Sequence, residues 1–127
     1  MDLVAMDPIP VMYVRAPGGS TGASEAFRRL EATLADLRGR KVYATTHAGE
    51  YRACVALHEG DDPVAVGLER GEIPGGTYVQ MRLQGALDDI PKGFATLAHA
   101  LVEDTTRPRV ECYARHDRVM LMLPVTP

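Results

Sequence analysis

The chain has 127 residues, of which 46% are hydrophobic and 24% charged, a composition typical of one globular domain. A net charge of −3 argues against the basic surface that nucleic-acid binding requires, and the longest apolar run, residues 119–125, is too short to span a bilayer. We therefore expect a single domain over residues 1–127, located in the cytoplasm, with neither nucleic acid nor membrane as a partner.

Two helices are predicted from apolar residues that recur three and four positions apart. The first covers residues 26–37, with Ser24 placed to cap its start and Gly39 to end it. The second covers residues 90–102, and Pro91 suits its first turn.

Seven strands surround these helices. The runs that favour strands are 11–15, 41–47, 51–58, 64–68, 77–83, 109–115 and 118–125. Short polar turns at 48–50 and 116–117 join two pairs of runs into hairpins. Each half of the chain therefore follows the order strand, helix, hairpin.

The two halves, about residues 10–70 and 73–127, align with each other. An offset of 67 residues places Phe27 on Phe94, and one further residue aligns the strands that follow the helices. The prediction is an α+β fold made of a duplicated βαββ unit with pseudo-twofold symmetry. Its curved antiparallel sheet carries both helices on one face.

Strand alternation predicts which side chains face the helices. In the run 109–115 the apolar set includes Val110 and Cys112, so Glu111 and Tyr113 are expected on the face away from the helices. A carboxylate among apolar neighbours loses hydration, which raises its pKa and suits a cation receptor or a proton donor and acceptor. The alternative is a surface glutamate paired with Arg109 or Arg82.

Tyrosine and methionine side chains near Glu111 predict an adaptable ligand pocket. Tyr43 aligns with Glu111 in the other half and is expected to face it across the pseudo-twofold axis. An oligomer interface, or tyrosines packed in the core, would produce the same pattern. The candidate ligand-binding residues are Glu111, Tyr113, Tyr78, Tyr43, Tyr51, Tyr13, Phe94 and Met120.

Metal and cofactor sites are not expected. The glycine-rich segment 16–23 lacks the lysine and serine that end a phosphate-binding loop. The four histidines show no ligand spacing, and Cys54 and Cys112 read as buried thiols in a reducing compartment.

Several short motifs carry a resemblance to a known family. They are IPGGTY at 73–78, Gly85, Glu-Cys-Tyr at 111–113 and LMLPV at 121–125. Through them the chain resembles the effector-binding domain family, which includes gyrase-inhibitor-like proteins and the ligand domains of multidrug-sensing transcription activators. The resemblance implies a pocket between the halves, with Glu111 as the pocket glutamate and Tyr113 beside it.

The same resemblance implies three functions. The first is the binding of a planar, largely apolar compound, with drug-like cations among the candidates. The second is hydrolysis of cyclopropane-bearing natural products, with Glu111 and Tyr113 as catalytic residues. The third is inhibition of a topoisomerase by surface contact. Family members often have a tryptophan near the second helix, and this chain has none. Because the first predicted strand begins near Val11, we expect no DNA-binding region, and we expect a monomer or homodimer.

Overall fold

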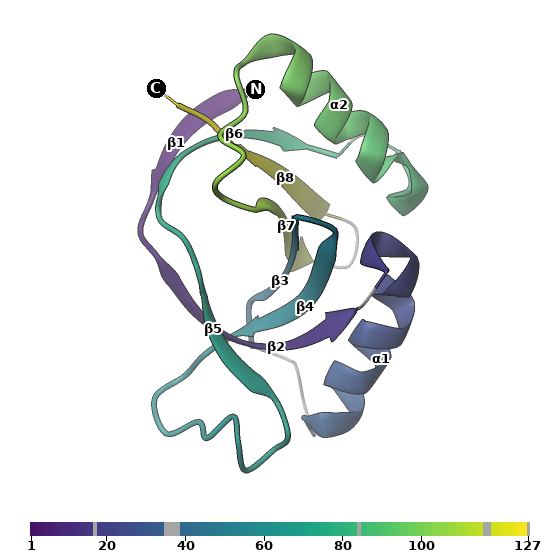
Figure 1. Ribbon diagram of the computed structural model, residues 1–127, viewed down its shortest axis with the longest axis vertical. Helices are drawn as coiled ribbons and strands as arrows, with labels where there is room; N and C mark the ends of the chain where they lie inside the picture. The colour runs from purple at the N-terminus through teal and green to yellow at the C-terminus, as the bar shows by residue number, and fades with distance from the viewer. Residues whose placement is uncertain (17, 35–38, 84, 116–117, 127) are drawn as a thin grey trace.

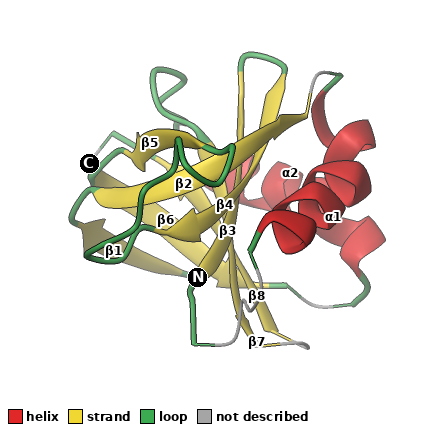
Figure 2. Cartoon of the chain, turned by 90° about the horizontal axis from the view of Figure 1, so that it is seen from below, coloured by secondary structure: helices red, strands yellow, loops and turns green. Residues whose placement is uncertain are grey.

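The computed structural model describes residues 1–16, 18–34, 39–83, 85–115 and 118–126. The predicted helix residue Leu37 and the predicted turn at 116–117 lie outside these ranges. Within them, eight strands form one antiparallel sheet that curls into a half-barrel. Both helices lie on the same side of this sheet, which we call its outer face; the opposite, hollow side is the inner face (Figures 1 and 2). The α+β class and the curved sheet with helices on one face are confirmed.

The element bounds follow in chain order. They are β1 (Asp2–Met6), β2 (Ile9–Ala16), α1 (Ala23–Thr33), β3 (Val42–His47), β4 (Glu50–Ala56), β5 (Glu69–Ile73), β6 (Gly76–Arg82), α2 (Ile90–Ala100), β7 (Arg109–Arg115) and β8 (Arg118–Pro124). The strand order in the sheet is β1-β6-β8-β7-β3-β4-β2-β5. If β2, β3 and β4 are exchanged with β6, β7 and β8, and β1 with β5, the same order results, read from the other end of the sheet. The topology thus has the symmetry that a duplication would produce, while superposition of the two halves stays a prediction.

Two strand predictions were wrong. Strand β1, which pairs with β6, was not predicted, and the run 64–68 is not a strand. Residues 63–68 instead form tight turns, in which the amides of Val66 and Leu68 both bond to the carbonyl of Pro63. A run of apolar residues predicts a strand only where a neighbouring strand can pair with it, and β5 begins at Glu69 instead.

Both helices are shorter than predicted. Helix α1 begins after Gly22 without a side-chain cap, so Ser24 lies within its first turn, and Leu34 already has extended backbone. Helix α2 has Pro91 in its first turn as predicted but ends at Ala100. The next two residues, Leu101 and Val102, are both exposed. Neither helix, nor any other helix among the described residues, is long and apolar enough to cross a membrane.

The helices pack on the outer face over separate parts of the sheet. Helix α1 buries Ala26 and Leu30 in a cluster with residues of β2, β3 and β4. Helix α2 buries Phe94 and Leu97 in a cluster with residues of β6 and β8. At Gly93 a β-carbon would lie 2.3 Å from Cδ1 of Leu121, so glycine allows α2 to approach β8 closely.

The inner face holds a third apolar cluster. Its buried members are Val11, Tyr13, Tyr43, Cys54, Ile73, Tyr78, Val110 and Met122. Because the sheet curls around this cluster, the central strands are buried on both faces. Alternation along such strands does not reveal which set faces the helices.

Candidate functional site

Glu111 lies on the outer face, at the boundary between the two helix-packed clusters. Its cross-strand neighbours are Ala44 on β3 and Leu121 on β8. Ala44 belongs to the cluster under α1 and Leu121 to the cluster under α2. Only 4% of Glu111 is exposed. The predicted position of Glu111 and Tyr113, on the face away from the helices, was therefore wrong.

The physical reason is that the apolar set of β7 has a core of its own on the inner face. Val110 is fully buried there, and Cys112 packs against the same cluster. Because β7 is buried on both faces, its more polar side chains lie in the core on the outer face. These side chains are Glu111 and Tyr113.

The expected pairing of Glu111 with Tyr43 was also wrong. Tyr43 pairs with Cys112 and belongs to the inner-face cluster. The register between β7 and β8 shifts between Tyr113 and Arg115, which absorbs one residue. Under the predicted duplication, an offset of 67 residues therefore aligns β3 with β7. In this alignment Ala44, not Tyr43, corresponds to Glu111.

Aromatic side chains surround the carboxylate. Tyr113 donates a hydrogen bond from Oη to Oε1 of Glu111. The ring of Phe27, from α1, meets Tyr113 edge to face at 5.6 Å and Tyr51 at 6.3 Å between centroids. Phe27 therefore packs against both tyrosines. We call Glu111, Tyr113, Tyr51 and Phe27 the outer-face cluster.

Burial dominates the electrostatics of this cluster. Loss of water raises the pKa of the Glu111 carboxyl, and the hydrogen bond from Tyr113 opposes that change only in part. Burial and the nearby carboxylate raise the pKa values of Tyr113 and Tyr51, so both phenols stay protonated at neutral pH. The cluster thus combines a carboxyl that can exchange a proton with two hydroxyl donors.

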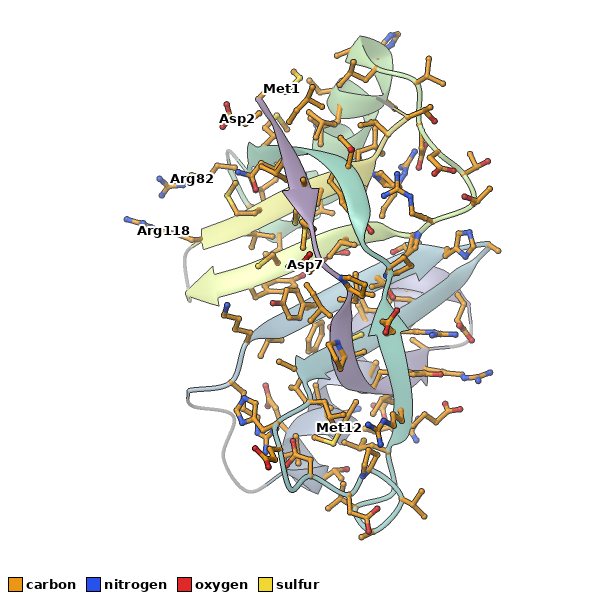
Figure 3. The ribbon with its side chains drawn as sticks, turned by 90° about the vertical axis from the view of Figure 1, so that its left-hand side faces the viewer. Met1, Asp2, Asp7, Met12, Arg82 and Arg118 are labelled. Carbon is orange, nitrogen blue, oxygen red and sulfur yellow. The ribbon has the colours of Figure 1, made fainter. Side chains whose placement is uncertain are left out.

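No cationic side chain compensates Glu111 among the residues that the structure describes. Arg109, two positions away, instead bonds to Glu103 with two N–O distances of 2.8 Å. Its guanidinium lies 5.4 Å from the ring centre of Phe94. Arg82 projects from the end of β6 near Arg118, away from the body of the protein (Figure 3). The alternative of a salt-bridged surface glutamate is therefore not realised.

The other predicted residues do not join Glu111. Tyr13, Tyr43 and Tyr78 pack in the inner-face cluster, and Met120 pairs with Cys112 on that side. The hydroxyl of Tyr78 donates to the carbonyl of Pro74 at 2.5 Å. Phe94 shares the outer face but packs under α2. Phe27 was not among the predicted site residues: helical spacing placed it toward the sheet but could not show which strand it meets.

The two cysteines are separated by one strand. Tyr43 on β3 pairs with Cys54 on β4 and with Cys112 on β7, so Cys54 and Cys112 lie two strand spacings apart, roughly 10 Å. This distance is too long for a disulfide, and both thiols are free. No group of three His, Cys, Asp or Glu side chains within the described part of the chain is arranged to hold a metal ion.

Solved structures share this fold over nearly the whole chain. An integron cassette protein from the Vibrio cholerae mobile metagenome is 13% identical, with a TM-score of 0.71 over 98% of this chain and 95% of that one. A hydrolase from Listeria innocua is 14% identical, with a TM-score of 0.68 over 98% and 90%. SAV2435, solved bound to tetraphenylphosphonium, is 14% identical, with a TM-score of 0.65 over 98% and 93%.

At these identities the matches establish a shared fold and nothing finer. No family model and no curated protein matches the sequence.

Proposed function

We propose that the protein binds a largely apolar aromatic cation, which the outer-face cluster holds against Glu111 between α1 and α2. One observation carries this proposal. Glu111 is a carboxylate that is 4% exposed and has tyrosine as its hydrogen-bond partner, without an ion pair among the described residues.

Such a carboxylate is costly to keep. Burial of a charge without a partner of opposite sign costs several kcal/mol, on the order of 3–5 in proteins. A bound cation would supply the missing charge, and the rings of Phe27, Tyr51 and Tyr113 would add cation–π attraction of about 0.5–2 kcal/mol. Because a bound cation would remove the cost of the unpaired Glu111 charge, this cost favours cation binding.

Access to Glu111 requires movement. Since Phe27 packs on both tyrosines and Glu111 has almost no exposed surface, a ligand reaches the carboxylate only when α1 or its side chains shift. SAV2435 holds tetraphenylphosphonium, a cation with four aromatic rings, on the same fold. That complex supports an aromatic cation as the ligand class.

Tetraphenylphosphonium and tetraphenylborate give the sharpest test because they share one shape and differ in the sign of their charge. The wild type should bind the phosphonium and reject the borate. Glu111→Gln should weaken phosphonium binding about 10–100-fold, which corresponds to the loss of a charge-assisted contact worth about 1.5–3 kcal/mol. Glu31→Gln, a change on the exposed side of α1, is the matched control and should leave the affinity unchanged.

Isothermal titration calorimetry measures both affinities. Equal binding of the phosphonium by wild type and Glu111→Gln would contradict the proposal, as would equal binding of the two ions by the wild type.

A second candidate function is hydrolysis of a strained cyclopropane ring, and the hydrogen bond between Tyr113 and Glu111 favours it. Glu111 would activate water or stabilise positive charge, and Tyr113 would donate a proton to the opened ring. Incubation with a cyclopropane-bearing alkylator should then give a product heavier by one water. Glu111→Gln should lower turnover about 10²–10⁴-fold with substrate affinity largely kept. A stable complex without this product supports the receptor.

A further inference from the structure

The two edges of the sheet differ in the charges that they carry. Strand β1 ends the sheet on one side and has Asp2 as its charged residue, whereas β5 ends it on the other side and is mostly charged. In β5, Glu69 is paired with Arg15 of the neighbouring β2 at 2.8 Å. Arg70 and Glu72 are exposed, and neither forms an ion pair with a described residue. The β5 edge therefore carries one free charge of each sign.

The backbone of β5 presents hydrogen-bonding groups along this edge. The carbonyl of Pro10 in β2 accepts from the amide of Leu57, so Pro10 directs its backbone toward the β4 side. The next residue, Val11, therefore directs its backbone toward β5, where it pairs with Gly71. Successive residues of a strand direct their amides and carbonyls to opposite sides. Gly71 thus bonds to β2, and the residues on either side of it direct their amides and carbonyls to the open edge.

The side chains of Arg70 and Glu72 lie together on the outer face. A β-carbon on Gly71 would lie 2.7 Å from Cε1 of Tyr13, and Ile73 is buried in the inner-face cluster, so this alternate set faces inward. Strand alternation places the other set outward. The same two residues thus supply opposite charges on one face and free backbone donors and acceptors along the edge.

We propose that β5 pairs with β5 of a second copy of this chain, antiparallel and with Gly71 on the twofold axis. Arg70 of each protomer then lies opposite the partner's Glu72, and the backbone groups of both residues bond across the axis. A shift of two residues either way keeps the backbone pattern but places Arg70 opposite Arg70 or Glu72 opposite Glu72. Like charges directly opposite each other destabilise a sheet, so the charges select this register.

The contact is short. The amide of Leu68 is already bonded to the carbonyl of Pro63, and Pro74, which would lie opposite Leu68, has no N–H. Small interfaces of this kind form weak complexes, so we expect a dissociation constant on the order of 0.1 mM. A twofold pair is closed, and the assembly should therefore stop at the dimer. This interface does not depend on a ligand at Glu111.

Charge reversal tests the pairing, because a change in one protomer can be compensated in its partner. Arg70→Glu places carboxylates opposite each other, and Glu72→Arg places guanidinium groups opposite each other, so each variant alone should be monomeric. An equimolar mixture of the two variants should dimerise, since every carboxylate then meets a guanidinium group. A chain with both changes should dimerise as the wild type does. Arg82→Glu, the same charge change at an exposed arginine of β6, is the control and should leave dimerisation unchanged.

Sedimentation equilibrium up to about 1 mM protein, roughly ten times the expected constant, measures the association. A wild type that stays monomeric at this concentration would overturn the proposal, as would assemblies larger than a dimer. A mixture of the two variants that associates no more than its components would also overturn it. Amide hydrogen exchange followed by NMR locates the contact. The amides of Arg70 and Glu72 should become protected as concentration rises, and that of Gly71 should not change; a dimer without this protection contradicts the proposal.

Discussion

The two faces of the sheet are both rich in tyrosine, but they treat charge differently. On the inner face the charged side chains lie in pairs near its rim, such as Arg52 with Glu50 at 2.6 Å and Arg15 with Glu69 at 2.8 Å. On the outer face Glu111 is buried with only tyrosine beside it. Tyrosine content therefore does not distinguish a packed face from a binding face. We instead distinguish them by the lack of a charge that compensates the buried Glu111.

The largest effect should come from placing a second carboxylate one residue away, on the inner face. Val110→Glu puts a charge into a fully buried position of the inner-face cluster. The free energy of unfolding should fall by about 3–5 kcal/mol at pH 7, the cost of an unpaired buried charge. Val110→Gln, with a similar shape and no charge, is the control in urea unfolding. If both variants lose the same stability, charge burial is not what separates the faces.

A smaller effect of opposite sign is expected when the charge on the outer face is removed. Glu111→Gln should raise the free energy of unfolding by about 1–3 kcal/mol at neutral pH, because it removes a desolvated charge and keeps an acceptor for Tyr113. Activity and stability would then conflict at this residue, as is common at binding sites.

The stability gained in Glu111→Gln should depend on pH, because the pKa of Glu111 is raised in the folded protein. The protonated carboxyl stabilises the folded state below the unfolded glutamate pKa of about 4.3, and this contribution is lost as pH rises through the higher folded pKa. The advantage of Glu111→Gln should therefore be small near pH 4 and should grow toward pH 8. A constant difference across this range in urea titrations would argue against a desolvated Glu111.

The smallest expected effect compares two tyrosine hydroxyls. Tyr113→Phe removes the donor to Glu111 and should cost about 1–2 kcal/mol at pH 7, the range for a hydrogen bond to a charged group. Tyr43→Phe on the inner face removes a hydroxyl for which the described residues provide no hydrogen bond, and it should cost less than about 0.5 kcal/mol. Thermal unfolding of the two variants measures both. Equal losses would mean that the Tyr113 hydroxyl does not stabilise the carboxylate.

Much of the fold could be predicted because helices and hairpins are encoded by residues close together in the sequence. The apolar spacing at 26–37 and 90–102 is such a local pattern. Strand β1 could not be predicted, since its partner β6 lies far along the chain, with Asp2 opposite Gln80. For the proposed site, residue chemistry and the family resemblance pointed to Glu111 and Tyr113, but alternation placed them on the wrong face of the sheet. The side chains on both faces of β7 are largely buried, so burial does not mark one face as the helix side. The bulge after Tyr113 also shifts the register by one residue. A single residue of register moves every side chain to the other face.

The protonation of Glu111 itself gives the most direct test of the central claim. Carbon NMR of the glutamate carboxyls, assigned with Glu111→Gln, follows this titration in the free protein and with saturating tetraphenylphosphonium. The free protein should titrate above the ordinary glutamate value of about 4.3, and the cation should lower that pKa because it stabilises the charged carboxylate. Tetraphenylborate should not lower it. A Glu111 that titrates at or below the ordinary value, or whose pKa does not respond to the cation, would contradict the account.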